Sequence, residues 1–152
     1  MRDLLIRPAK STDIEGIKQA FRSSVWGIDD SIYNADQKRA WEAAIPADSW
    51  PTRILEFRFL VASLDEKIVG FASHSEHRLE DLYVAAEASG QGVGSLLLAE
   101  VLKDYSGKEI TLTASLNAEQ IYLKFGFIEE ERFTRTIGSV EVWCIHMKRP
   151  IV

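Results

Sequence analysis

The sequence contains one cysteine, four prolines and no long apolar run. Cys144 alone cannot form an internal disulfide or complete a metal site, so we expect a reducing, cytoplasmic location and no metal. No apolar segment approaches the roughly 18 residues of a membrane-spanning helix, and we identify no apolar leader of the secretory type. We therefore expect a soluble protein without a membrane partner.

Positive charge is also scarce. Lys and Arg number 18 against 23 Asp and Glu, which gives a formal net charge of −5 at pH 7. The basic clusters at 38–39 and 148–149 are too small for the basic face of a nucleic-acid-binding protein, so we expect no nucleic-acid partner. An acidic balance is compatible with a cationic acceptor, although net charge does not describe any one cleft.

The chain has enough apolar residues for one folded domain. Its 152 residues are 46% hydrophobic and 27% charged, near the averages of globular proteins. This length suits a core of three layers and is too short for two ordinary domains. We expect a single domain over residues 1–152.

Residue periodicity predicts an α/β (α+β) fold. The expected order is β-α-α-β-β-β-α-β-α-β-β, which indicates a mixed sheet with helices on both faces. Strands are expected at 4–6, 58–63, 67–73, 79–84, 110–113, 127–133 and 140–147, and helices at about 12–25, 36–45, 93–102 and 117–125.

Local signals refine these elements. Thr12 and Glu15 predict a capping box at the start of the first helix. Trp50-Pro51 is expected in a loop, and Asp65-Glu66 in the turn of a hairpin. Gly126 is a natural left-handed end for the last helix.

Three glycines, Gly90, Gly92 and Gly94, lie between the strand that ends at Val84 and an apolar helix. Glycines allow the backbone to turn with its N–H groups converging, and the helix N-terminus adds about half a positive charge. Together these features predict a cradle for phosphate or pyrophosphate. The alternative is a glycine-rich turn without a ligand.

Two familiar phosphate loops do not fit. A Walker A loop needs Gly-Lys-Ser/Thr, and the corresponding tripeptide here is Gly94-Ser95-Leu96. A Rossmann loop needs a third glycine where Ser95 stands and an acidic residue on the next strand, which 110–114 lacks. ATP and NAD are therefore disfavoured.

The loop resembles that of the GNAT acetyltransferases, whose pattern at a strand–helix junction is Arg/Gln-x-x-Gly-x-Gly/Ala. Gly92 and Gly94 match the two small positions, and 82–84 matches the preceding strand. Ser89 stands where the family usually has Arg or Gln. The backbone cradle is expected to survive that change.

A second motif follows the next strand. Residues 114–127 resemble the family's Ala-Ser-x-x-Ala-x-x-aromatic/aliphatic-Tyr-x-Lys-x-Gly-Phe. A helix with the pattern Gln-x-x-Ala-Trp, from Gln37 to Trp41, is similar to one in an uncharacterised GNAT subfamily. The second motif matches at Ala114, Ser115, Ala118, Ile121, Tyr122, Lys124, Gly126 and Phe127.

The resemblance implies a GNAT acyl-CoA N-acyltransferase fold, with a mixed, mostly antiparallel sheet of six or seven strands. It implies direct transfer of the acetyl group of acetyl-CoA to a primary amine of a small molecule or protein. The residues implied to bind the cofactor are Leu82, Tyr83, Val84, Ser89, Gly90, Gln91, Gly92, Val93, Gly94, Ser95, Ser115, Tyr122 and Lys124.

The resemblance also assigns the general acid. Tyr122 matches the family tyrosine that protonates the departing sulfur, and a phenol with a pKa near 10 lies just above a thiol. The alternative is an aromatic core residue with a satisfied hydroxyl. Ser115 stands where many relatives carry an Asn that bonds the pantetheine, so a bridging water is expected there.

The general base must take a proton from an alkyl ammonium. The candidates on or before the central strand are His74, His77, Glu80 and Asp81. Some relatives use a glutamate that aligns with Arg78, and Glu80 points to the same side of the strand. We assign the base to Glu80; the alternative is a polar residue on a partly exposed strand. For both histidines, surface or turn positions are expected.

In the family, the N-terminal third shapes the acceptor pocket. Trp26, Tyr33 and Trp41 are therefore expected to line it, with core packing as the alternative. Cys144 is expected to be a small buried hydrophobe.

Two other functions remain open from the sequence. A non-catalytic acetyl-CoA or CoA sensor would keep the cradle without turnover, and an interaction domain would need no cradle. The resemblance also implies a homodimer, since dimers are frequent among the relatives. The acceptor amine is not identified by the sequence.

Overall fold

Two sheets form the framework of the protein. In the computed structural model, which describes residues 3–151, one sheet has the strand order β1-β2-β3-β4 and the other β5-β7-β6. All strand pairs within the sheets are antiparallel, as expected, although the strands fall in two sheets rather than one. The strands are β1 (Leu4–Pro8), β2 (Arg58–Leu64), β3 (Lys67–His74), β4 (Leu79–Val84), β5 (Ile110–Ser115), β6 (Ile128–Ile137) and β7 (Val140–Arg149).

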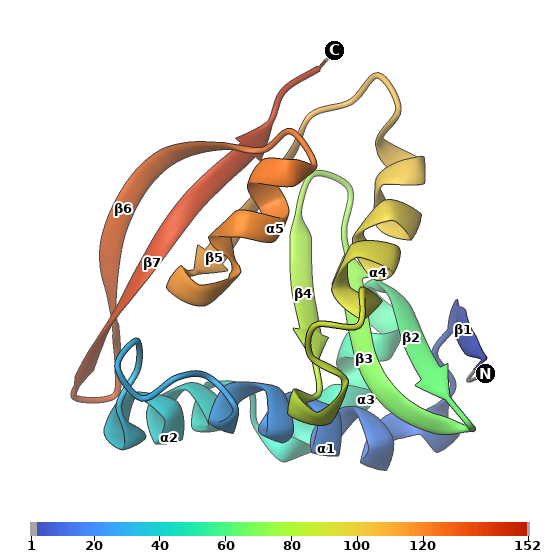
Figure 1. Cartoon of the computed structure of the whole chain (residues 1–152), viewed down its shortest axis with the longest axis horizontal. Coiled ribbons are helices and arrows are strands. Elements are labelled where there is room, and N and C mark those ends of the chain that lie inside the picture. The colour runs from blue at the N-terminus through green and yellow to red at the C-terminus, as the bar shows by residue number, and fades with distance from the viewer. Residues whose placement is uncertain (1–2, 152) are drawn as a thin grey trace.

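The sheets meet between β4 and β5. Among the described residues they share one isolated parallel bridge, between Arg78 and Thr111, beside a 2.9 Å hydrogen bond from the Thr111 N–H to the His77 carbonyl. From this point the two strands separate (Figure 1). Because β4 pairs with β3 alone, the backbone groups on its other edge face the space between the sheets.

Helices cover both faces of the first sheet, as expected. α1 (Ile14–Trp26) and α3 (Trp50–Glu56) pack on one face, and α4 (Val93–Leu102) packs on the other, with α5 (Glu119–Lys124) beside it. α2 (Ala35–Ala44) continues the lower layer of helices and contacts β6 and β7 (Figure 1). No helix in residues 3–151 combines the length and apolar character that a bilayer span requires.

Strand alternation produces the two cores. On β2, Val61 faces the core under α1, whereas the next residue, Ala62, faces the core under α4. Phe71 and Ala72 divide in the same way on β3. Each fully buried large apolar side chain contributes about 1.5–3 kcal/mol relative to exposure, so the two cores together stabilise the sheet to which β4 belongs.

The predicted capping box at the start of α1 is wrong. The helix begins at Ile14, after a short 3₁₀ turn that includes Thr12. Asp13 forms the polar contacts there: its carboxylate accepts from the Lys10 N–H at 2.8 Å and from Arg7 at 2.7 and 2.9 Å. The Arg7 guanidinium lowers the pKa of Asp13, so this carboxylate stays charged in mild acid.

The expected loop at Trp50-Pro51 is also wrong. These residues form the first turn of α3, where a proline is tolerated because its missing N–H would be unpaired anyway. Trp50 is buried against Phe21 and Phe71. The turn at 65–66 is confirmed, and both of its residues have positive φ.

Candidate functional site

The loop between β4 and α4 leaves N–H groups without partners. Gly92 is the N-cap of α4, and the first helical hydrogen bond runs from the Leu96 N–H to its carbonyl at 3.1 Å. The N–H groups of Val93, Gly94 and Ser95 therefore have no intrahelical acceptor. No described side chain caps this helix.

Electrostatics at this helix end favour an anion. The first turn of α4 contains no acidic residue, and the cavity in front of it is also lined by Lys124 from the last turn of α5. Three free N–H groups, the positive end of the helix dipole and an ammonium point to the same kind of ligand. The arrangement suits a phosphate or diphosphate.

The three glycines have two different roles. Gly90 and Gly92 adopt φ values of 76° and 81°, where a Cβ would be strained, and a Cβ at either would meet nothing within 4 Å. At Gly94 a Cβ would lie 3.2 Å from Ile121 Cδ1 of α5. The first two therefore shape an open backbone surface, and the third allows α4 and α5 to pack closely.

A cavity of about 570 Å³ opens in front of this loop; we call it the cradle cavity. Its floor is β4 and its sides are α4, α5 and the end of α1, which is tied to the loop by a 2.9 Å hydrogen bond from the Ala86 N–H to Ser23 Oγ. The expected cofactor residues that line it are Leu82, Val84, Ser89, Gly90, Gly92, Val93, Gly94, Ser95, Tyr122 and Lys124.

The other expected cofactor residues lie elsewhere. Gln91 lines none of the cavities described here, and its amide donates to the Glu87 carbonyl at 3.2 Å. Tyr83 and Ser115 line a second cavity of about 320 Å³, between β4, β5, α2 and the β6–β7 hairpin. This second cavity is large enough for a small molecule.

A smaller hollow of about 50 Å³ lies between the two cavities. It shares Leu82 and Tyr122 with the cradle cavity, and Glu80 and Ser115 with the second cavity. The two cavities and the hollow thus follow one another along the separation of β4 and β5, and Tyr122 lines the cradle cavity and the hollow.

The Tyr122 side chain is buried on α5, and its ring packs edge-on against Phe127 at 5.7 Å. Its hydroxyl has no hydrogen-bond partner among residues 3–151, so it is not the satisfied core hydroxyl of the alternative interpretation. Burial raises the pKa of Tyr122, with smaller contributions from Tyr83 and Asp81. The phenol is therefore protonated at neutral pH.

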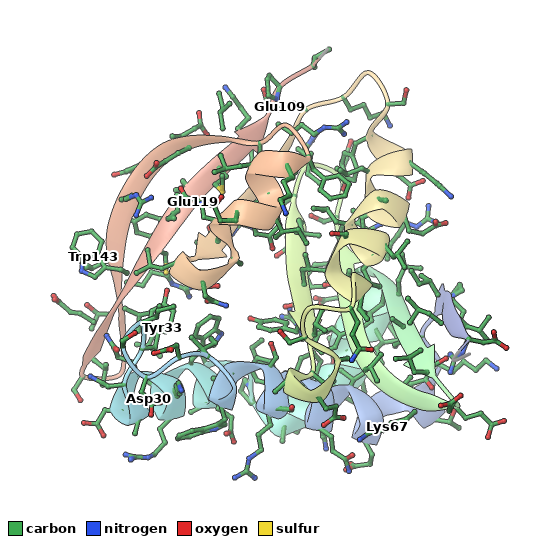
Figure 2. All side chains as sticks on the ribbon, viewed as in Figure 1. Asp30, Tyr33, Lys67, Glu109, Glu119 and Trp143 are labelled. Carbon is green, nitrogen blue, oxygen red and sulfur yellow. The ribbon has the colours of Figure 1, made fainter. Side chains whose placement is uncertain are left out.

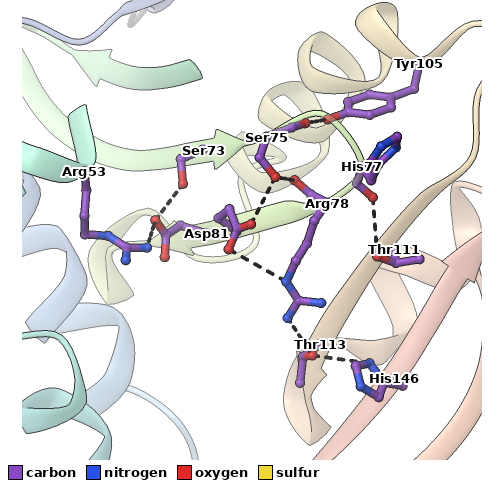
Figure 3. A network of polar contacts seen from close by, with 11 residues as sticks. Arg53, Ser73, Ser75, His77, Arg78, Asp81, Tyr105, Thr111, Thr113 and His146 are labelled. Carbon is purple, nitrogen blue, oxygen red and sulfur yellow. Dashed lines mark hydrogen bonds and ion pairs between the residues drawn. The ribbon is translucent and has the colours of Figure 1, made fainter. Parts of the chain in front are cut away.

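Two of the four candidate bases lie on β4. Glu80 lines both the second cavity and the hollow; its Oε1 accepts from Ser75 Oγ at 3.1 Å and its Oε2 lies 3.7 Å from Arg78 Nε. Arg78 in turn donates to Thr113 Oγ1 at 2.7 Å across the separation of the sheets (Figure 3). Each Glu80 oxygen has one polar contact, and a carboxylate oxygen can accept more than one hydrogen bond.

Asp81 is engaged instead in a buried cluster. Its Oδ2 accepts from Arg53 at 2.5 Å and from Ser73 Oγ at 2.6 Å (Figure 3). The Asp81 carboxylate thus joins α3 to β3.

The histidines lie away from both cavities. His74 was expected at the surface or in a turn, but it is buried on β3 with Nδ1 3.1 Å from the Tyr105 hydroxyl. This expectation is wrong because both faces of β3 are covered, and Tyr105 packs against the His74 ring. His77 is exposed in the turn between β3 and β4, as expected.

Two of the three expected pocket aromatics line the second cavity. Trp41 does so from α2 and donates from Nε1 to the Tyr83 hydroxyl at 3.1 Å. Tyr33 is buried, and its hydroxyl donates to the Trp143 carbonyl at 2.7 Å and accepts from the Leu116 N–H at 2.9 Å. Figure 2 shows Tyr33 beneath β7, where it links α2 to that sheet.

Trp26 does not join them. It lies at the end of α1, where its indole donates to Glu42 Oε1 at 2.6 Å outside the cavities described here. Trp26 thus lines neither cavity and is partly exposed beside α2, and its place in an acceptor pocket stays a prediction. Cys144 lines the second cavity and is buried, and burial raises the pKa of its thiol.

Sequence reasoning missed three arginines of the second cavity as ligand-facing groups: Arg53, Arg78 and Arg135. Arg53 lies on α3, Arg78 just before β4, and Arg135 on β6. No short sequence motif links these three positions. It also missed Gly27 at the end of α1, which lines the cradle cavity. Because Gly27 directly follows the predicted first helix, the sequence could have indicated that the helix ends there. It could not have indicated that Gly27 lines the cavity.

Known proteins resemble this chain. A family model described as an acetyltransferase (GNAT) domain matches residues 29–148. The uncharacterized N-acetyltransferase YafP of Escherichia coli (strain K12) is 30% identical over 127 residues, which cover 84% of this chain and 83% of that protein.

Solved structures also match. A GCN5-related N-acetyltransferase from Rhodopseudomonas palustris has a TM-score of 0.88 and 25% identity, covering 97% of this chain and 95% of that one. PaiA N-acetyltransferase from Thermoplasma acidophilum, solved in complex with coenzyme A, has a TM-score of 0.77 and 22% identity, covering 97% and 99%.

Proposed function

The chain belongs to the GNAT acetyltransferase family, and from this premise we propose that it transfers the acetyl group of acetyl-CoA directly to a primary amine. The acceptor would be a small molecule or an exposed protein amine. The observation that carries the proposal is the position of Tyr122, whose unpartnered hydroxyl lies where the cradle cavity meets the hollow that leads to the second cavity.

The cradle fits the diphosphate of acetyl-CoA. The free N–H groups of Val93, Gly94 and Ser95 would hold the phosphate oxygens, and Lys124 would add a charge-assisted contact. The unpaired edge of β4 would offer backbone groups to the pantetheine arm, which is the role that the resemblance implies for 82–84. When bound, acetyl-CoA supplies an acetyl thioester, an activated acyl donor.

The residues between the cavities can move two of the protons of the reaction. Glu80 would take one proton from the acceptor ammonium, which leaves a neutral amine to attack the thioester carbon, and a second proton would leave the nitrogen for water once the carbon–nitrogen bond has formed. Tyr122 would give its phenolic proton to the sulfur as the carbon–sulfur bond breaks. The products are an amide and a thiol, and the two side chains regain their original states by exchanging protons with water.

A non-catalytic sensor is not favoured. A sensor would need the cradle but not a path from it to a second cavity. The unpartnered phenol of Tyr122 and the open carboxylate of Glu80 are both placed along that path. A release assay for the CoA thiol, with acetyl-CoA and a panel of primary amines, distinguishes the two functions: an enzyme releases thiol only when an amine is present.

We also propose that residues 1–152 act as one domain in the cytoplasm, where an unpaired thiol such as Cys144 is stable. A homodimer is proposed from the family resemblance.

A charge placed at the helix end tests the cradle. Ser95→Asp puts a carboxylate among the free N–H groups, where it would satisfy them and repel a diphosphate. We expect the dissociation constant for CoA to rise about 10- to 100-fold, while the free energy of unfolding without ligand rises by about 0.3–1 kcal/mol. Isothermal titration and thermal melting measure the two effects.

Ser95→Asn is the matched control, since it has the same shape without the charge. It should bind CoA within a few-fold of the wild type. Equal affinities for the Asp and Asn variants would contradict the location of the diphosphate at this helix end.

A further inference from the structure

The second cavity contains one guanidinium without a partner. Arg53 is paired with Asp81 at 2.5 Å, and Arg78 lies 3.7 Å from Glu80. Arg135 forms no hydrogen bond or ion pair with any residue in 3–151. The charged groups that line this cavity therefore leave one positive charge uncompensated, although the whole chain is acidic.

The Arg135 side chain projects from β6, where its residue pairs with Val142 of β7. Its charge acts on groups at two other walls of the cavity. Burial raises the pKa of the Cys144 thiol on β7, and Arg135 opposes that effect. Burial likewise raises the pKa of Tyr83 on β4, and Arg135 is among the groups that lower it. Arg135 itself lines the cavity, so its charge is available to an occupant.

The rest of the lining limits the size and character of an occupant. The cavity holds about 320 Å³, which suits a small molecule rather than a folded partner. Apolar side chains from α2 and the β6–β7 hairpin form one side of it, and Glu80 lies on the β4 side near the hollow that leads to Tyr122. The apolar lining residues are Trp41, Ala44, Ile45, Ile137 and Val142.

We propose that the acceptor is a small amine that also carries a carboxylate, as a free amino acid does. Its carboxylate would pair with Arg135, and its amine would face Glu80 and the hollow. A guanidinium presents a planar fork of donors that matches the two oxygens of a carboxylate. The inference rests on the proposed acetyl transfer. The negative net charge of the whole chain was compatible with a cationic acceptor. The charged residues that line this cavity have an excess of one positive charge, so an acceptor with a carboxylate fits it better.

Matched amine pairs test the proposal. Phenylalanine, tyrosine, leucine and tryptophan are compared with phenethylamine, tyramine, isopentylamine and tryptamine, which lack only the carboxylate. In the wild type we expect kcat/KM, measured by CoA thiol release, to favour the carboxylate member of at least one pair by about 10- to 100-fold. In Arg135→Gln that ratio should fall to about 1, and Arg135→Lys should keep part of it.

Arg39→Gln is the control, since Arg39 pairs with Asp36 on α2 and does not line the second cavity. It removes the same charge from the chain and should leave the ratio at the wild-type value. A wild-type ratio near 1 in every pair, or a ratio that Arg135→Gln does not change, would overturn the proposal while acetyl transfer itself still stands.

A binding measurement separates this inference from the proposed activity. With CoA present, N-acetylphenylalanine should bind more tightly than its neutral amide, and Arg135→Gln should abolish the difference. If no amine is acetylated but this difference is found, the carboxylate site stands and the proposed activity fails. If the acid and the amide bind equally, the carboxylate site fails.

Discussion

Tyr122→Phe is expected to lower kcat for acetyl transfer by about 10²- to 10⁴-fold, the usual contribution of a positioned acid. The substitution removes only the hydroxyl, which has no partner among the described residues, and keeps the ring that packs on Phe127. Affinity for acetyl-CoA should therefore stay within about two-fold, and the free energy of unfolding should not fall, because no protein hydrogen bond is lost. Steady-state kinetics, titration and thermal melting measure the three quantities.

Tyr33→Phe provides the comparison, because its hydroxyl is fully engaged. Removing it leaves the Leu116 N–H and the Trp143 carbonyl without their partner. We expect a loss of about 1–3 kcal/mol in the free energy of unfolding. Tyr122→Phe should thus lower kcat without lowering the free energy of unfolding, whereas Tyr33→Phe should lower the free energy of unfolding. Normal turnover in Tyr122→Phe would remove Tyr122 as the acid.

Glu80→Gln is expected to lower kcat/KM by about 10²-fold near pH 7. An alkyl ammonium with a pKa near 10 is almost entirely protonated there, so a base must remove the proton. Each unit of rising pH increases the neutral fraction of the free amine about tenfold until pH approaches that pKa. The ratio of wild-type to variant kcat/KM should therefore shrink as pH rises, to less than about tenfold near pH 9.5. A pH profile of kcat/KM for both proteins measures this.

Asp81→Asn is the matched control on the same strand. Asp81 holds Arg53 and Ser73, so its loss should lower the free energy of unfolding by about 1–3 kcal/mol, without a deficit that fades as pH rises. A Glu80→Gln deficit that stays constant over the pH range would show that Glu80 acts by position or charge rather than as the base.

The cradle could be predicted from the sequence because its determinants are local. Gly90, Gly92 and the helix that follows lie within a few residues of one another, and backbone conformation alone produces the free N–H groups. Tyr122 was assigned from a family motif around one short helix, and its role as the acid stays a prediction. Such sites depend little on how distant segments pack.

The second cavity could be predicted only in part, because distant segments form it. Trp41 and Arg135 meet there from α2 and β6, and neither position carries a local pattern that shows where its side chain points. Trp26 was assigned to the pocket on its place in the chain alone, and the packing of α1 turned it outward. The buried position of His74 likewise depends on Tyr105, which is 31 residues further along the chain and packs against its ring.

The same limit explains the errors in the fold. A proline after a tryptophan reads equally well as a loop or as the first turn of a helix, and burial of Trp50 between Phe21 and Phe71 decides the matter. Thr12 and Glu15 have the spacing of a capping box. In the structure Asp13 pairs with Arg7, Thr12 lies in a 3₁₀ turn, and α1 begins only at Ile14.

The free N–H groups at the start of α4 predict that the cradle binds acetyl-CoA. Thermal melting with acetyl-CoA, CoA, ATP and NAD, each at about 100 times a plausible micromolar dissociation constant, tests it most directly. We expect the two CoA species to stabilise the protein by about 2.7 kcal/mol, which raises Tm by roughly 5–10 °C, and ATP and NAD to raise it far less. An unchanged Tm with both CoA species would show that the cradle does not bind acetyl-CoA. An equal rise with ATP would show that it does not select the CoA species.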